Sequence, residues 1–71
     1  MYVKELSINE DFIRLDSALK YAGFVSTGGH AKICIQNGEV KVNGEVCTLR
    51  GKKLRVGDTA EFENKTLKIV K

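Results

Sequence analysis

The sequence predicts an α+β domain in which two short helices pack on a small, mostly antiparallel sheet of about four to five strands. Two observations carry this prediction. In the first half of the chain apolar residues recur at helical spacing, and each such segment ends at a glycine. After Gly38 the apolar period changes to two, and turn-forming pairs separate the segments. The length of 71 residues suits one small domain, which we place at residues 1–71.

The first expected elements are a strand and a helix. The segment "YVKELSI" has Leu6 and Ile8 on one face, so we expect a strand at residues 2–8. The segment "DFIRLDSALKYAG" repeats apolar residues at the spacing i, i+3, i+4, i+7 of an amphipathic helix, which Gly23 ends and whose start we expect at Glu10 and Asp11. These apolar residues are Leu15, Ala18, Leu19 and Ala22.

The second helix is expected from about Gly28 to Asn37, after the short link "FVS". Its apolar face consists of Ala31, Cys34 and Ile35, and Gly38 closes it. Beyond it, "EVKV" and "EVC" flank Asn43-Gly44, which is the strongest short signal for a hairpin with a type I′ turn.

Three further strands are expected after this hairpin. The segment "KLRV" turns at Gly57-Asp58 into "TAEFE", and Asn64-Lys65 turns that strand into "TLKIVK". The strands at residues 59–71, like the strand at residues 2–8, flank a central part at about residues 12–58. No linker or repeat interrupts the chain.

The charge is unevenly distributed along the chain. Residues 30–57 contain six basic and two acidic residues, and they hold the whole positive excess of a protein with a net charge of +3. A local basic patch is typical of a protein that meets phosphates, although a basic turn that keeps the protein soluble gives the same pattern. Because no apolar run approaches about 20 residues, we expect a cytoplasmic protein without a membrane partner.

Catalytic and metal-binding motifs are missing from the sequence. It has no nucleophile elbow, no zinc-protease motif and no P-loop, and one histidine with two separated cysteines is no zinc ligand set. We therefore expect no enzyme, no cofactor, no metal and no small-molecule substrate. Cys34 and Cys47 are expected as reduced thiols that fill the core, and a disulfide would require that the helix and the hairpin bring them together.

Four segments in a fixed order resemble the S4 RNA-binding domain: "RLDSAL" (14–19), "TGGHAKICIQNG" (27–38), "VKVNG" (40–44) and "VGD" (56–58). The resemblance runs from about Phe12 to Asp58 and implies the S4-like (alpha-L) fold. It looks like the free-standing type, in which the S4 module with a few added strands is the whole protein.

The resemblance also implies where RNA is bound. In S4 domains the contacts gather at the start of the second helix and on the adjoining hairpin and loop. Many members have "SRS" where this chain has "TGG", so Gly28 stands in place of an arginine. We therefore expect backbone amides and Lys32 to make the phosphate contact at this point. The implied RNA-binding residues are Thr27, Gly28, Gly29, His30, Lys32, Lys41, Asn43, Arg50, Lys52 and Lys53.

Elementary electrostatics favours the same place, because a helix N-terminus presents free N–H groups and a partial positive charge. Two alternatives stay open here: the glycines shape a tight turn, and His30 is an ordinary surface residue. Scattered aromatic residues argue against stacking of single-stranded bases.

The expected function is a small monomeric protein that binds structured RNA, either ribosomal RNA or a ribosomal particle. An adaptor that docks an acidic protein through the same basic face is the alternative. DNA binding is a third reading, and the sequence offers no recognition helix for it.

Overall fold

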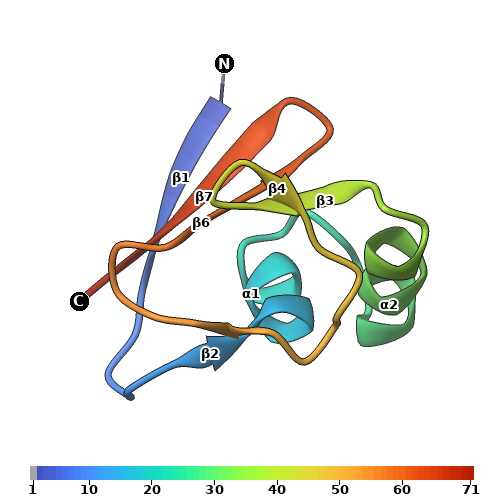
Figure 1. Ribbon diagram of the computed structural model, residues 1–71. Helices are drawn as coiled ribbons and strands as arrows, with labels where there is room; N and C mark the ends of the chain where they lie inside the picture. Colours follow the sequence, from blue (N-terminus) through green and yellow to red (C-terminus); the bar gives the residue numbers. More distant parts are fainter. Residues whose placement is uncertain (1) are drawn as a thin grey trace.

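The computed structural model describes residues 2–71. Two helices, α1 (Leu15–Tyr21) and α2 (Gly28–Gln36), cover one face of a five-stranded sheet (Figure 1). In spatial order its strands are β1 (Tyr2–Ser7), β7 (Lys65–Val70), β6 (Thr59–Phe62), β3 (Val40–Val42) and β4 (Glu45–Val46). A separate two-stranded ribbon consists of β2 (Ile13–Arg14) and β5 (Lys53–Leu54). The predicted α+β arrangement of two helices on a small sheet is confirmed.

The sheet is mostly antiparallel, as predicted. β3 pairs antiparallel with β4 and β6, and β6 pairs antiparallel with β7, whereas the edge strand β1 runs parallel to β7. The parallel pair joins the two ends of the chain, and Ile8 extends it by donating its backbone N–H to the carbonyl of Val70.

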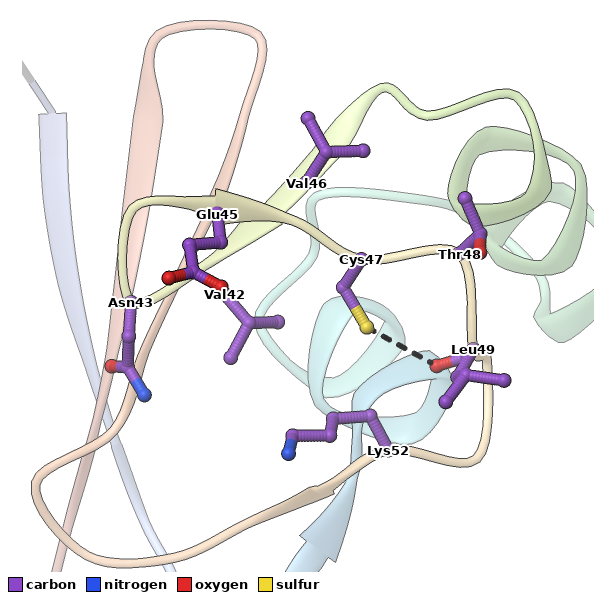
Figure 2. Close-up of a pocket in the computed structure, with 8 residues that line it drawn as sticks. All are labelled: Val42, Asn43, Glu45, Val46, Cys47, Thr48, Leu49 and Lys52. Atoms are coloured by element: carbon purple, nitrogen blue, oxygen red, sulfur yellow. Dashed lines mark hydrogen bonds between the residues drawn. The ribbon is translucent and has the colours of Figure 1, made fainter.

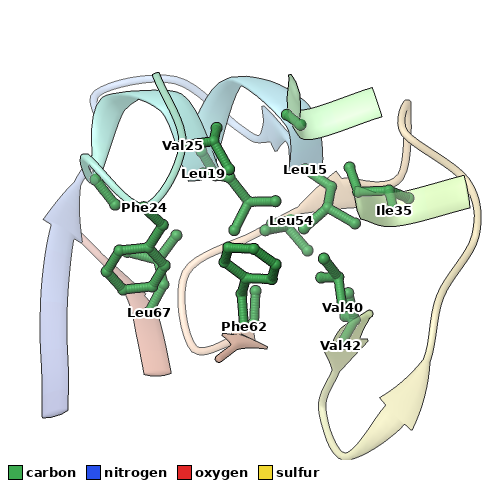
Figure 3. Packing of buried hydrophobic residues seen from close by; sticks show 14 of the residues in the cluster. Leu15, Leu19, Phe24, Val25, Ile35, Val40, Val42, Leu54, Phe62 and Leu67 are labelled. Atoms are coloured by element: carbon green, nitrogen blue, oxygen red, sulfur yellow. The ribbon is translucent and has the colours of Figure 1, made fainter. Parts of the chain in front are cut away.

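The core lies between the helices and the inner face of the sheet. Leu15 and Leu19 of α1 and Ile35 of α2 are fully buried against the strands (Figure 3). Side chains alternate along β3, β6 and β7, so every second residue there enters this core and its neighbours face outward. The buried strand residues of the sheet are Val40, Val42, Ala60, Phe62, Leu67 and Ile69.

Both hairpin turns consist of residues with positive φ, and one of them lies one residue earlier than predicted. Asn43 and Gly44 have φ values of 51° and 87°, which confirms the type I′ turn between β3 and β4. The turn between β6 and β7 lies at Glu63 and Asn64, with φ values of 51° and 64°, so the prediction of Asn64-Lys65 was wrong by one residue. Lys65 is already paired with Phe62 in the ladder.

The start of the first helix was also predicted wrongly. Glu10 and Asp11 precede β2, and α1 begins only at Leu15. The reason is the ribbon, in which Ile13 pairs with Leu54 and holds this part of the chain extended. For the same reason "KLRV" contributes only Lys53–Leu54, and these residues pair outside the main sheet.

Candidate functional site

The loop between β4 and β5 closes the N-terminus of α1 with its backbone. The N–H of Leu15 donates to the carbonyl of Lys52 at 2.8 Å, and the N–H of Asp16 donates to the carbonyl of Arg50 at 3.1 Å. A turn from Leu49 to Lys52 orders the loop, because the N–H of Lys52 donates to the carbonyl of Leu49. The backbone of the loop faces the helix, and the side chains of Arg50 and Lys52 are exposed.

Arg14 lies beside this loop. Its Nη2 atom is 3.8 Å from the point where a Cβ on Gly51 would stand, and its cross-strand partner in the ribbon is Lys53. The guanidinium makes an ion pair of 3.2 Å with Asp16 and keeps a side-chain exposure of 52%. Exposed pairs of this kind contribute at most about 1 kcal/mol, so the guanidinium remains available to a stronger anion. We call Arg14, Arg50, Lys52 and Lys53 the loop cluster.

Sequence reasoning missed Arg14 as a site residue. It expected this arginine inside a helix, and the β2–β5 pairing that brings it to the loop joins segments about 40 residues apart. The position of the Lys53 side chain is also defined, because its ammonium lies over the ring of Phe12, 4.8 Å from the ring centroid. This contact orients the charge without removing it from the surface.

The N-terminus of α2 is open by comparison. The Thr27 hydroxyl accepts a hydrogen bond of 3.1 Å from the N–H of His30, which makes Thr27 the N-cap of the helix. The N–H of Ala31 already donates to the carbonyl of Thr27. Gly28 and Gly29 therefore retain N–H groups without an acceptor among residues 2–71, and both residues are exposed.

The two glycines at this end are not required by the fold. Neither has a positive φ, and a Cβ would meet nothing within 4 Å at Gly28 and only the Thr27 hydroxyl, at 3.9 Å, at Gly29. The idea that these glycines shape a tight turn has no support in this geometry. His30 is exposed, and its imidazole makes no hydrogen bond within the described chain.

Lys32 follows on α2 and is exposed. Figures 1 and 3 both show the segment after β4 running beside α2 before it reaches the start of α1. The start of α2, Lys32 and the loop cluster consequently lie on the helical side of the molecule. Seven of the residues implied by the resemblance lie there: Thr27, Gly28, Gly29, His30, Lys32, Arg50 and Lys52, and Lys53 adjoins them in the ribbon.

Two other residues implied by the resemblance are placed differently. Lys41 lies between the buried Val40 and Val42, so it projects from the outer face of the sheet, away from the helices, opposite Glu61 on β6. Asn43 is exposed, but its side-chain oxygen accepts from the N–H of Thr59 at 2.9 Å and its amide donates to Asp58 at 3.2 Å. Its polar atoms hold the hairpin against β6.

The cysteines are both free, and burial distinguishes them. Cys34 is buried on α2, and burial, with smaller effects of the carboxylates of Glu39 and Glu63, raises the pKa of its thiol. Cys47 is half-buried beside β4. Within residues 2–71, no three His, Cys, Asp or Glu side chains converge as a metal site requires, and no helix is long and apolar enough to cross a membrane.

The chain resembles known proteins over most of its length. A sequence profile of the S4 domain matches residues 6–70. A Bacillus subtilis protein named as a probable ribosome maturation protein, RlbA, is 43% identical over 58 residues, which are 82% of this chain and 82% of that protein. An Escherichia coli protein named as a candidate RNA-binding protein, YbcJ, is 36% identical over 58 residues, or 82% and 83% of the two chains. The small ribosomal subunit protein uS4 of Nitrobacter winogradskyi is 43% identical over 51 residues, which are 72% of this chain and 25% of that protein.

Proposed function

The chain belongs to the S4 domain family, and from that premise we propose that it is a non-enzymatic protein that binds structured RNA. The ligand is ribosomal RNA or a ribosomal particle, and the protein acts as a cytoplasmic monomer. RNA is held on the helical side of the molecule, by the open N-terminus of α2, by Lys32 and by the loop cluster.

One observation carries the proposal, which is the concentration of exposed cations around a loop that the backbone holds in place. The loop cluster has four cationic side chains with one carboxylate, Asp16, among them. Because the loop carbonyls of Arg50 and Lys52 are tied to α1, their side chains project without an entropic cost for ordering the backbone on binding. Cations held in this way suit phosphates of a folded RNA, whose positions are fixed.

The free N–H groups of Gly28 and Gly29 support the same surface. Two backbone donors at the positive end of a helix dipole form an anion site, and side-chain-free glycines let a phosphate oxygen approach closely. Where many S4 domains have an arginine, this chain has Gly28, so the phosphate is bound here by the backbone and by Lys32. The ribosomal part of the proposal rests on the names of the relatives, a ribosome maturation protein and a ribosomal protein.

The test compares two pairs of lysines with the same change of charge. We expect Lys32→Glu with Lys52→Glu to abolish binding of purified ribosomal RNA in a filter assay. Lys41→Glu with Lys68→Glu changes the charge equally on the outer face of the sheet and should leave most of the affinity. Lys53 is left unchanged because its ammonium packs on Phe12. Wild-type affinity should fall by about 10³-fold or more between about 50 and 200 mM salt if six or more phosphates are contacted.

Circular dichroism of both double variants should match the wild type, since all four lysines are exposed. Equal losses of RNA affinity in the two double variants would contradict the proposed surface, because they would show that only the net charge of the protein matters. Crosslinking in cells, followed by sequencing of the attached RNA, identifies the ligand. Recovery of protein partners alone, without RNA, would favour the adaptor that docks an acidic protein.

A further inference from the structure

A pocket of about 500 Å³ lies next to the loop cluster, between the β3–β4 hairpin and the turn from Leu49 to Lys52 (Figure 2). Its volume falls within the range of about 300–1,000 Å³ that is usual for sites of small ligands. The residues that line it are Val42, Asn43, Glu45, Val46, Cys47, Thr48, Leu49 and Lys52.

Both walls of the pocket are held in place before any ligand binds. The hairpin wall is fixed by Asn43, whose backbone N–H donates to the carbonyl of Thr59 and whose side chain also bonds to the start of β6. The opposite wall is the turn that α1 holds through the carbonyls of Arg50 and Lys52. A pocket between two hydrogen-bonded walls loses little entropy when it is filled.

The lining combines apolar contact with one free acceptor. Leu49 has an exposure of 67%, so the core does not account for it, and the Cys47 thiol donates to the Leu49 carbonyl at 3.7 Å (Figure 2). The side chain of Val46 points away from the pocket, on the same face of the hairpin as its cross-strand partner Lys41. Glu45 projects from the hairpin, and Lys52 lies on the opposite side. The Glu45 carboxylate makes no hydrogen bond or ion pair within residues 2–71.

A carboxylate in this position is unfavourable for a phosphate and favourable for a nucleobase. An ionised carboxylate accepts hydrogen bonds through two oxygens and donates none. Guanine offers two adjacent donors on its Watson–Crick edge, the N1–H and the exocyclic N2–H, which match the two oxygens. Adenine and cytosine each offer one amino group beside an acceptor nitrogen, and uracil flanks its single N–H with two carbonyls.

We propose that the pocket takes one unpaired guanine of the bound RNA. Glu45 accepts the hydrogen bonds of the Watson–Crick edge, Leu49 contacts the base, and Lys52 at the rim binds the adjoining phosphate. The inference rests on the proposed RNA binding and adds to it a preference for RNA with a bulged or looped-out guanine. Sequence is usually read in RNA at such unstacked bases.

The experiment uses five RNA hairpins that differ only in a single bulged nucleotide, which is G, A, C or U, or is absent. At a fixed salt concentration we expect the bulged G hairpin to bind the wild-type protein about 10-fold tighter than the other four, a value in the range of one bidentate base contact. Glu45→Gln should reduce this preference to less than about 2-fold. Glu61→Gln, which makes the same charge change on the outer face of the sheet, should keep it.

A second readout tests whether the pocket itself is filled. The bulged G hairpin should slow alkylation of Cys47, whereas the fully paired hairpin should not. Leu49→Ala should weaken binding of the bulged G hairpin. It should hardly change the free energy of unfolding of the protein, because Leu49 is exposed. Equal wild-type affinity for all five hairpins would overturn the guanine pocket and leave RNA binding intact. Binding of none of them, together with no binding of ribosomal RNA, would overturn both.

Discussion

The N-termini of the two helices contain the same chemical groups and use them differently. In α1 the first two N–H groups are taken by the carbonyls of Lys52 and Arg50, so they contribute to folding. In α2 the Thr27 hydroxyl satisfies one N–H, and those of Gly28 and Gly29 stay at the surface. The first end fixes the loop that presents cations, and the second end is, in the proposed function, itself the anion site.

Under the proposed function, this difference lets a chain of 71 residues combine folding and RNA binding on one side. The loop needs no core of its own, because the α1 N-terminus and the β2–β5 ribbon anchor it. The α2 N-terminus needs no loop, because its helix is held by Ala31, Cys34 and Ile35 in the core. Damage to the anchor should therefore affect the whole fold, and damage to the α2 cap should affect little beyond it.

The largest effect is expected at the anchor of the loop. Leu54 in β5 is fully buried, and Leu54→Ala should lower the free energy of unfolding by about 2–5 kcal/mol, since it removes buried methyl groups and leaves a cavity. Leu49→Ala is the matched control, because Leu49 lies in the same loop with an exposure of 67% and should change stability by about 0.5 kcal/mol or less. Urea denaturation followed by circular dichroism measures both. Similar losses in the two variants would show that the ribbon is not the anchor.

A smaller effect is expected at the cap of α2. Thr27→Ala removes the acceptor for the N–H of His30 and should lower the free energy of unfolding by about 1 kcal/mol. Thr48→Ala serves as the control, because Thr48 is exposed and caps no helix. Thermal or urea unfolding distinguishes the two variants. If Thr27→Ala unfolds as the wild type does, the cap of α2 contributes nothing to its stability.

The elements predicted from the sequence are those set by neighbouring residues. The α2 helix, its closing Gly38 and the Asn43-Gly44 turn depend on short-range spacing and on positive φ, with 77° at Gly38. The β2–β5 ribbon depends on pairing between distant segments, and no local pattern indicates it. The start of α1, the extent of "KLRV" and the role of Arg14 were missed for that single reason.

The candidate site was predictable to a similar extent. The open start of α2 follows from the sequence, because the two glycines and Lys32 are adjacent to the cap. Lys41 was grouped with them by resemblance, although the alternation of Val40, Lys41 and Val42 already places this lysine opposite the buried face. The pocket beside Glu45 had no signal in the sequence, since its two walls meet only in the folded chain.

A substitution at Gly28 in α2 should change stability and RNA binding in opposite directions. Gly28 has no positive φ and open space around its Cβ position, so Gly28→Ala should raise the free energy of unfolding by about 0.4–1 kcal/mol by reducing the freedom of the unfolded chain. The added methyl group should at the same time weaken binding of ribosomal RNA, because it keeps a phosphate from the backbone N–H groups. Urea denaturation and filter binding on the same variant test this. A stabilised variant with unchanged RNA affinity would remove Gly28 from the site.

The smallest effect is expected at the buried side of α2, where Cys34 titrates. Because burial raises the pKa of this thiol in the folded state, its contribution to stability is fully present below the unfolded value of about 8.5 and declines as the pH rises towards the folded value. Urea denaturation at pH 7 and pH 9.5 measures this decline. Between the two pH values the free energy of unfolding should fall more in the wild type than in Cys34→Ala, which lacks the buried thiol. Equal losses in the wild type and Cys34→Ala would mean that the thiol ionises as easily in the folded chain as in the unfolded one.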